Sequence, residues 1–200
     1  MMDIEILEDE IRVDNKTITE LDSFVLDFTM ILSKYVEYVI VSGYVAIFFG
    51  RSRGTEDIDV ISKKMDKRTF LELHDDLAGR GYEFLNPEDA SGLYEMLEEG
   101  LAIRISKTRR VIPNIELKFT KDDFDTYSLS HRLKVTLNKE ILYLNPIEMQ
   151  IPYKLWLSSE KDIEDALYLW DIFKERIDKG SMKMLMAELE VEGGGYGIEI

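Results

Sequence analysis

The chain has 200 residues, which is enough for one large domain or for one domain with a small appendage. Hydrophobic residues make up 45% and charged residues 32%, so the composition is that of a globular protein and not of a collagenous or disordered chain. The net charge of −15 argues against broad, nonspecific binding to nucleic acid, because affinity for a phosphodiester backbone comes from cationic contacts.

Cysteine is absent, which excludes disulfides, thiolate zinc sites and thiol nucleophiles. The two histidines, His74 and His131, lie far apart in the sequence, so neither a histidine metal site nor a Ser-His relay is expected. An active site must therefore rest on carboxylates, lysine, arginine and the backbone. The acidic N-terminal stretch carries no signal-peptide pattern, and every apolar run is shorter than a membrane span. We expect a cytoplasmic protein without a membrane partner.

The spacing of apolar residues predicts strands alternating with helices up to residue 145. Thr19 and Asp22 have the spacing of a capping box, which predicts a helix from about Glu20 to Lys34. Asp66 is the expected N-cap of a helix that stops at Gly79 or Gly81. The other elements expected are strands or hairpins at 3–13, 38–42, 57–62, 82–85, 101–106, 115–119 and 132–145, and short helices at 44–49, 88–100 and 122–128, of which the second is expected to open at Pro87.

After Asn145 the composition becomes helical. Pro146 fits the first turn of one helix, Ser159 is the expected cap of the next, and a methionine-rich helix follows at 181–191. We therefore predict an α/β core at 1–145, a helical subdomain at 146–192 and a flexible tail at 193–200. The fold class predicted is α/β (α+β), with a mixed β-sheet core flanked by helices and a C-terminal helical segment.

Asp57 and Asp59 are the first candidates for chemistry. Residues two apart on a strand point to the same face, so these carboxylates should project side by side. Two neighbouring carboxylates raise each other's pKa, and a fold tolerates this where a cation such as Mg²⁺ or Mn²⁺ lies between them. The spacing alone is a weak signal, since Asp123 and Asp125 share it. A solvated strand end is the alternative interpretation.

Three neighbouring features strengthen the first interpretation. Ser42 and Gly43 form a strand-to-helix turn whose free N–H groups suit a phosphate, although a plain turn has the same sequence. Arg51 and Arg53 precede the aspartates and have the geometry to bind phosphate oxygens, unless they are solvated loop residues. Glu116 lies inside an apolar strand, where a carboxylate is costly unless something binds it; the alternative is a half-exposed edge strand.

Together these residues resemble the nucleotidyltransferase superfamily, which has the polymerase-beta-like fold. The similarity is greatest to the small prokaryotic AbiEii-like branch, whose members read roughly Gly-Gly-x-Ala and then Gly-x-x-Arg-x-Thr-x-Asp-h-Asp. The residues that match the second motif are Gly50, Arg53, Thr55, Asp57 and Asp59. The branch also carries a lysine and a Lys-Asp-x-x-Asp element on C-terminal helices, which Lys154, Lys161, Asp162 and Asp165 fit, with a solvated helix face as the alternative. The chain departs from the family in having Ser42 before Gly43 and Glu116 in place of the commoner aspartate.

The resemblance implies metal-dependent transfer of a nucleoside monophosphate from an NTP to an acceptor hydroxyl. It implies Mg²⁺ (or Mn²⁺) on Asp57, Asp59 and Glu116, with Glu116 helping to deprotonate the acceptor. The nucleotide-binding residues that it implies are Ser42, Gly43, Arg51, Arg53, Thr55, Lys154 and Asp162. The acceptor remains open between a protein, a tRNA end and a small molecule. The basic cluster at 104–110 either touches RNA phosphates or is a solvated hairpin turn.

Two further interpretations stay open. The chain could be a nucleotidyltransferase-like component of a toxin–antitoxin pair that acts by binding its cognate protein, for which the methionine-rich helix at 181–191 offers an adaptable face. Ordinary packing is the alternative for that helix. The chain could also be a homologue that binds NTP without transferring it. Mg²⁺-dependent stabilisation by NTP would separate an enzyme from a partner-binding module.

Overall fold

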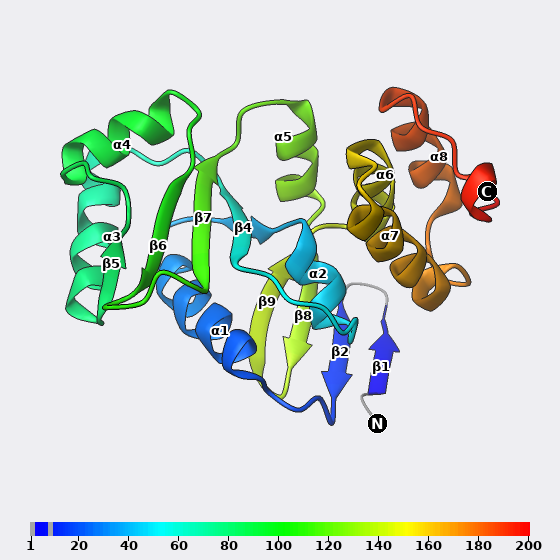
Figure 1. Cartoon of the computed structure of the whole chain (residues 1–200), viewed down its shortest axis with the longest axis horizontal. Coiled ribbons are helices and arrows are strands. Elements are labelled where there is room, and N and C mark those ends of the chain that lie inside the picture. The colour runs from blue at the N-terminus through cyan, green and yellow to red at the C-terminus, as the bar shows by residue number, and fades with distance from the viewer. Residues whose placement is uncertain (1–2, 8–9) are drawn as a thin grey trace.

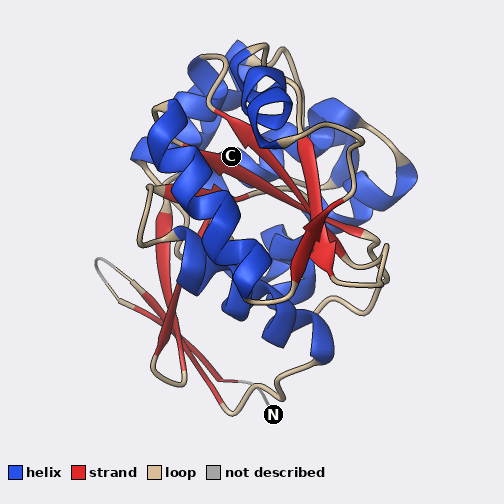
Figure 2. Ribbon diagram, turned by 90° about the vertical axis from the view of Figure 1, so that its left-hand side faces the viewer, coloured by secondary structure: helices blue, strands red, loops and turns tan. Residues whose placement is uncertain are grey.

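The computed structural model describes residues 3–7 and 10–200 (Figure 1). The described residues form one mixed sheet in the strand order β1-β2-β8-β9-β3-β4-β7-β6-β5, with helices on both sides of the strands (Figure 2). The fold class is therefore the one predicted. The strands are β1 (Asp3–Ile6), β2 (Ile11–Asp14), β3 (Tyr38–Ile40), β4 (Asp57–Ser62), β5 (Tyr82–Phe84), β6 (Ile103–Lys107), β7 (Asn114–Phe119), β8 (Leu133–Leu137) and β9 (Glu140–Leu144). The helices are α1 (Glu20–Leu32), α2 (Gly43–Phe48), α3 (Lys67–Gly79), α4 (Ala90–Glu98), α5 (Asp123–Ser130), α6 (Ile147–Leu157), α7 (Glu160–Phe173) and α8 (Lys179–Glu188).

Side-chain caps decide where several helices begin. The predicted capping box of α1 is present, with Thr19 and Asp22 exchanging hydrogen bonds. Asp66 caps α3 and Ser159 caps α7, as expected. The prediction that Pro87 opens a helix is wrong, because α4 starts three residues later, where the side chain of Asp89 accepts a hydrogen bond from the third residue along.

The N-terminal strands form one edge of the sheet. β1 and β2 pair in antiparallel fashion, as a hairpin predicts, and β2 then lies parallel to β8. The turn of this hairpin, Glu8 and Asp9, lies outside the described residues. The hairpin predicted at 132–145 is present as β8 and β9, and β9 meets β3 through a single residue pair, Ile40 with Leu144.

The centre of the sheet separates a buried face from a polar one. Ile58 and Val60 of β4, with Ile115 and Leu117 of β7, have no exposed side-chain surface and belong to the same buried cluster as Phe28 of α1. Because side chains alternate along a strand, the residues between them project to the other side of the sheet. This alternation carries the acidic residues of β4 and β7 away from the main core.

The C-terminal helices lie at the opposite end of the molecule from α3, α4 and β5 (Figure 1). α7 packs against the end of α2, where the rings of Phe49 and Phe173 are 4.9 Å apart and Tyr168 donates a hydrogen bond to the Phe49 carbonyl. The methionine-rich helix α8 buries Met182 and leaves Met184 62% exposed, so part of its methionine surface serves ordinary packing.

The last residues also carry structure. Gly194–Tyr196 form a short 3-10 turn, and Ile198 is buried among the core residues. Within residues 3–7 and 10–200, no helix combines the length and the apolarity that a membrane crossing requires.

Candidate active site

The ladder between β4 and β7 determines which side chains lie beside the two aspartates. Asp59 is paired in register with Glu116, and Asp57 with Asn114. Residues two apart on a strand share a face, and residues paired across two strands lie side by side. Asp57, Asp59 and Glu116 therefore rise from the same face of the sheet.

Asp59 is the most strongly perturbed of these acids. Burial is the largest cause of its raised pKa, and the neighbouring charge of Asp57 is the next. Glu116 raises the pKa further, whereas the Ser42 side chain and the charge of Lys118 oppose the shift. The position thus concentrates negative charge on half-buried side chains that solvent screens only in part, which is the environment that a bound cation stabilises.

Glu116 shares the face of Asp59, but its carboxylate is already bound. Arg104, its partner on β6, reaches Oε1 of Glu116 with a guanidinium nitrogen at 2.7 Å. β7 lies between β4 and β6, so it is not the half-exposed edge strand that was the alternative for Glu116. In the described part of the chain, no group of three or more acidic, histidine or cysteine side chains converges closely enough to hold a metal ion. Of the three carboxylates expected at the site, Asp57 and Asp59 are adjacent, and Glu116 is paired with the guanidinium of Arg104.

The turn at Ser42 and Gly43 is strained and firmly held. Ser42 has φ +62° and ψ −137°, a conformation that favours glycine. Its carbonyl accepts a 2.8 Å hydrogen bond from Nε2 of Gln150, and Oε1 of Gln150 accepts one from Asn145. Gln150 and Asn145 are both buried, so Gln150 of α6, itself held by Asn145, fixes the backbone of this turn.

Replacing Ser42 with glycine should remove the strain at this turn. We expect Ser42→Gly to raise the free energy of unfolding by about 1 kcal/mol, because a non-glycine residue in such a region costs roughly that much. Urea unfolding measures the change. Ser42→Ala is the matched control, since it loses the hydroxyl but keeps the strained backbone. An equal rise in both variants would show that the hydroxyl, and not the backbone strain, is the unfavourable element.

Arg51 and Arg53, expected to face phosphate, are both turned to carboxylates of α7. Arg53 binds both oxygens of Asp165, through Nε at 3.1 Å and a terminal nitrogen at 2.9 Å. Arg51 pairs with Asp165 and with Glu164, and it donates to the Lys161 carbonyl at 3.0 Å. Neither side chain is a solvated loop arginine, since their exposed fractions are 13% and 15%.

Gly43 has a structural role in placing one of these arginines. A Cβ at Gly43 would overlap the guanidinium of Arg53, whose central carbon lies 3.0 Å from that position. The glycine therefore lets Arg53 cross the turn to reach Asp165. As the side chains stand, Arg53 covers the backbone at which a phosphate was expected.

The lysine and aspartates of the C-terminal helices extend the same network. Lys154 is 1% exposed and places Nζ 2.5 Å from Asp162 and 3.1 Å from Asp165. Ser159 also donates to Asp162 at 2.5 Å. Hydrogen bonding to Lys154 and Ser159 outweighs burial and keeps the pKa of Asp162 below its usual range. The alternative of a solvated helix face is wrong for these residues.

Two further residues of this region had no place in the sequence prediction. Lys118 follows Glu116 by two positions on β7, so it shares the acidic face, and its Nζ lies 3.1 Å from Asp125 of α5. The strand alternation that singled out Glu116 also indicates Lys118. Gln150 acts through the main chain of a turn 108 residues away, and no local pattern indicates that contact.

Asp57 and Asp59 fit a divalent cation by their chemistry. Carboxylate oxygens are the ligands that Mg²⁺ and Mn²⁺ prefer, and burial together with the neighbouring charge of Asp57 raises the pKa of Asp59, a cost that a bound cation would offset. Thr55 fixes the first of the pair, with its hydroxyl 2.8 Å from the Asp57 carbonyl and 3.3 Å from Oδ1 of the same residue. Glu116 would join such a site only if Arg104 released it.

The arrangement of strands and helices in this chain has counterparts among solved structures. The crystal structure of an antigenic nucleotidyltransferase-like protein from Paracoccidioides brasiliensis is similar with a TM-score of 0.51 and 16% identity, over 84% of this chain and 85% of that one. The crystal structure of ANT(2'')-Ia in complex with adenylyl-2''-tobramycin gives a TM-score of 0.53 and 13% identity, over 86% and 98% of the two chains.

A second structure of the same neighbour agrees. The solution structure of the antibiotic-resistance factor ANT(2'')-Ia has a TM-score of 0.51 and 12% identity, over 88% of this chain and 95% of that one. The chain has the nucleotidyltransferase fold. Identities of 12–16% establish the fold alone. No protein-family model matches the sequence, and no curated protein matches it.

Proposed function

We propose that this protein is a metal-dependent nucleotidyltransferase. The observation that carries the proposal is the pair Asp57 and Asp59 on one face of β4, with Glu116 in register on β7, in a chain with the nucleotidyltransferase fold. A half-buried pair of like charges costs stability, and it fits best a site that binds a cation. The Gly50-to-Asp59 motif supports assignment to the AbiEii-like branch.

The proposed reaction is an in-line substitution at the α-phosphorus of an NTP. The oxygen of an acceptor hydroxyl bonds to the α-phosphorus, the bond to the bridging oxygen of the β-phosphate breaks, and pyrophosphate leaves with that electron pair. The hydroxyl proton passes to a carboxylate of the acidic face, a role we assign to Glu116 after Arg104 releases it.

The chain's own residues supply position and charge. Asp57 and Asp59 would hold Mg²⁺ or Mn²⁺, which when bound stabilises the charge on the transferring phosphoryl group. Ser42 and Gly43 would contact the phosphates at the turn that Gln150 holds. Arg51 and Arg53 lie beside that turn as cations, with Lys154 and Asp162 behind them, and Thr55 orients Asp57.

One specific observation favours a second candidate function, that of a homologue that binds NTP without transferring it. Glu116 is paired with Arg104, and Arg53 covers Gly43 while bound to Asp165. If these pairs persist with nucleotide bound, the third carboxylate and the phosphate contacts stay out of reach. Such a chain would bind nucleotide weakly and leave it intact.

Nucleotide binding is the first test of the proposal. We expect each NTP to raise the melting temperature only when Mg²⁺ or Mn²⁺ is present, because the cation must screen Asp57 and Asp59 from the triphosphate. The measurement is a thermal shift assay with and without metal. The control is Asp123→Asn, which alters an exposed aspartate of α5 and should leave the shift unchanged. Absence of any metal-dependent shift would contradict both candidate functions.

Transfer separates the two candidates. Incubation with α-labelled NTP, Mg²⁺ and cell extract should attach label to an acceptor if the chain is an enzyme. A metal-dependent thermal shift without transferred label would identify the chain as an NTP-binding homologue. The acceptor class, whether protein, tRNA end or small molecule, is the fraction that gains the label.

A further inference from the structure

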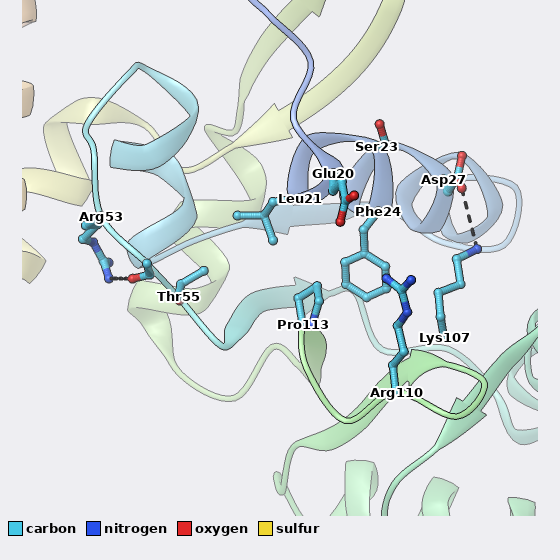
Figure 3. A pocket seen from close by; sticks show the side chains of 11 residues that line it. Glu20, Leu21, Ser23, Phe24, Asp27, Arg53, Thr55, Lys107, Arg110 and Pro113 are labelled. Carbon is cyan, nitrogen blue, oxygen red and sulfur yellow. Dashed lines mark hydrogen bonds and ion pairs between the residues drawn. The ribbon is translucent and has the colours of Figure 1, made fainter.

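A pocket of about 530 Å³ lies at one end of the central strands (Figure 3). Its walls are the first turns of α1, the loop at 53–55, and the connection between β6 and β7. The basic cluster at 104–110 spans the end of β6 and the start of that connection, and the proposed reaction assigns to it only the Arg104 contact. The pocket is of the size that holds a small molecule.

The pocket adjoins the acidic face through Thr55. The hydroxyl of Thr55 lines the pocket and lies 3.3 Å from Oδ1 of Asp57. On the other side, Pro113 lines the pocket, and the next residue, Asn114, is the strand partner of Asp57. The floor of the pocket belongs to the core that α1 covers, whereas Asp57 rises from the other face of the sheet, so Thr55 at the end of β4 is the point where the pocket and the first candidate metal ligand meet.

Hydrogen bonds hold the wall formed by the β6–β7 connection. The main-chain N–H of Arg109 donates to Oε1 of Glu83 on β5 at 2.9 Å. The hydroxyl of Ser106 donates to the Pro113 carbonyl at 2.7 Å. The backbone that carries Lys107 and Arg110 is thus tied both to the neighbouring strand and to itself, so the pocket has a defined shape.

The charges that face the pocket are of both signs. Lys107 is balanced, because its Nζ lies 3.6 Å from Asp27 and 3.8 Å over the ring of Tyr82. Glu20 and Arg110 make no ion pair with any residue in the described ranges 3–7 and 10–200. Figure 3 shows their charged groups turned toward the space between α1 and the connection.

The same pairs argue against RNA as the ligand. Of the four cations in the cluster at 104–110, Arg104 is paired with Glu116 and Lys107 with Asp27. The pocket also presents the carboxylate of Glu20, which repels a phosphodiester. An apolar floor of Leu21, Phe24 and Pro113 remains between the two unpaired charges.

We infer that this pocket binds the acceptor of the transfer, and that the acceptor is a small amphoteric molecule. A cationic group of the ligand would face Glu20, an anionic group would face Arg110, and its apolar body would lie on Phe24 and Pro113. To react, a hydroxyl of the ligand would extend past Thr55, around the end of β4, toward Asp57. The assignment as acceptor depends on the proposed function, whereas the binding does not.

Binding is tested first, with the small-molecule fraction of a cell extract as the probe. The purified chain is incubated with this ultrafiltrate, and retained compounds are identified by mass spectrometry. We expect wild type and Arg109→Ala to retain the same compounds, and Arg110→Ala to retain about tenfold less of them, because a charged partner is lost. Arg109 is the matched control, since it is exposed like its neighbour Arg110 but does not line the pocket.

Glu20→Gln tests the other end of the pocket. It should retain less of the same compounds that Arg110→Ala fails to retain. The melting temperatures of both variants, and the rise in melting temperature that NTP and metal cause, should equal those of wild type. Equal retention by Arg110→Ala and Arg109→Ala would overturn the inference. Retention of no compound by wild type would also overturn it.

The transfer assay then tests the role as acceptor. Label should enter the small-molecule fraction, and Arg110→Ala should raise the acceptor KM about tenfold relative to Arg109→Ala. Label in RNA or protein would refute this inference and leave the proposed function standing. A lack of metal-dependent NTP binding would instead refute the proposed function, and the retention experiment would still decide whether the pocket binds its ligand.

Discussion

Asp59→Asn is expected to lower nucleotidyl transfer by at least about a thousandfold, because electrostatic stabilisation supplies most of the rate in phosphoryl chemistry. Asparagine keeps the shape of the side chain and removes the charge that would hold the metal ion. The measurement is the rate of label transfer at saturating Mg²⁺. Asp123→Asn is the control, since Asp123 and Asp125 repeat the same spacing on helix α5, where Asp123 is exposed. Parental activity in Asp59→Asn would refute the assignment.

The same variant should be more stable than wild type at neutral pH. The raised pKa of Asp59 means that the folded state holds its proton more tightly than the unfolded chain does, so stability from this group falls as pH rises through the folded-state pKa. Asparagine abolishes that loss. The stability difference between Asp59→Asn and wild type should therefore be greatest at neutral pH and shrink as the pH approaches the ordinary aspartate value of 3.8. Urea unfolding at several pH values measures it.

Asp165→Ala is expected to lower the free energy of unfolding by about 3–5 kcal/mol, because it removes the one buried carboxylate that three cations share. Asp165 has no exposed side-chain surface and binds Arg51, Arg53 and Lys154. Removing it leaves Arg53 without a carboxylate partner among the described residues, while Arg51 keeps Glu164 and Lys154 keeps Asp162. The midpoint and slope of urea unfolding give the change in free energy.

The neighbouring residue provides a matched control for that substitution. Glu164 also pairs with Arg51, but its side chain is 59% exposed. Solvent screens such a pair, so Glu164→Ala should change the free energy of unfolding by less than about 1 kcal/mol. Similar losses of unfolding free energy in the two variants would show that the buried ion pairs of Asp165 do not stabilise the fold more than the exposed pair of Glu164.

Local sequence patterns predicted the starts of α1, α3 and α7 and the face of the aspartates. Thr19 with Asp22, and Asp57 with Asp59, are each set by spacing within one element, so the sequence alone defines their geometry. The strands that flank the site follow from the same apolar alternation. The fold class and the shared face of the carboxylate pair are therefore predictable from patterns within single elements.

The pairing of the remaining charges is not predictable in this way. Arg104 meets Glu116 because two strands adopt one register, and Arg53 meets Asp165 across 112 residues of chain. A carboxylate or an arginine in a motif has many possible partners, and a protein side chain satisfies the same chemistry as a metal or a phosphate. The sequence indicates that these groups need opposite charges, and only the packed structure shows which ones they have.

The contacts that hold the Ser42 turn link the N-terminal and C-terminal parts of the chain. Its backbone is held by Gln150 of α6, and the loop after it is anchored in Asp165 of α7. The strained turn at Ser42, in the strand-bearing part of the chain, is thus held in place by the helices α6 and α7 that follow it in the sequence. Severing the chain after Asn145 would release that segment and uncover Phe49. We therefore expect the portions on the two sides of residue 145 to unfold together in one transition.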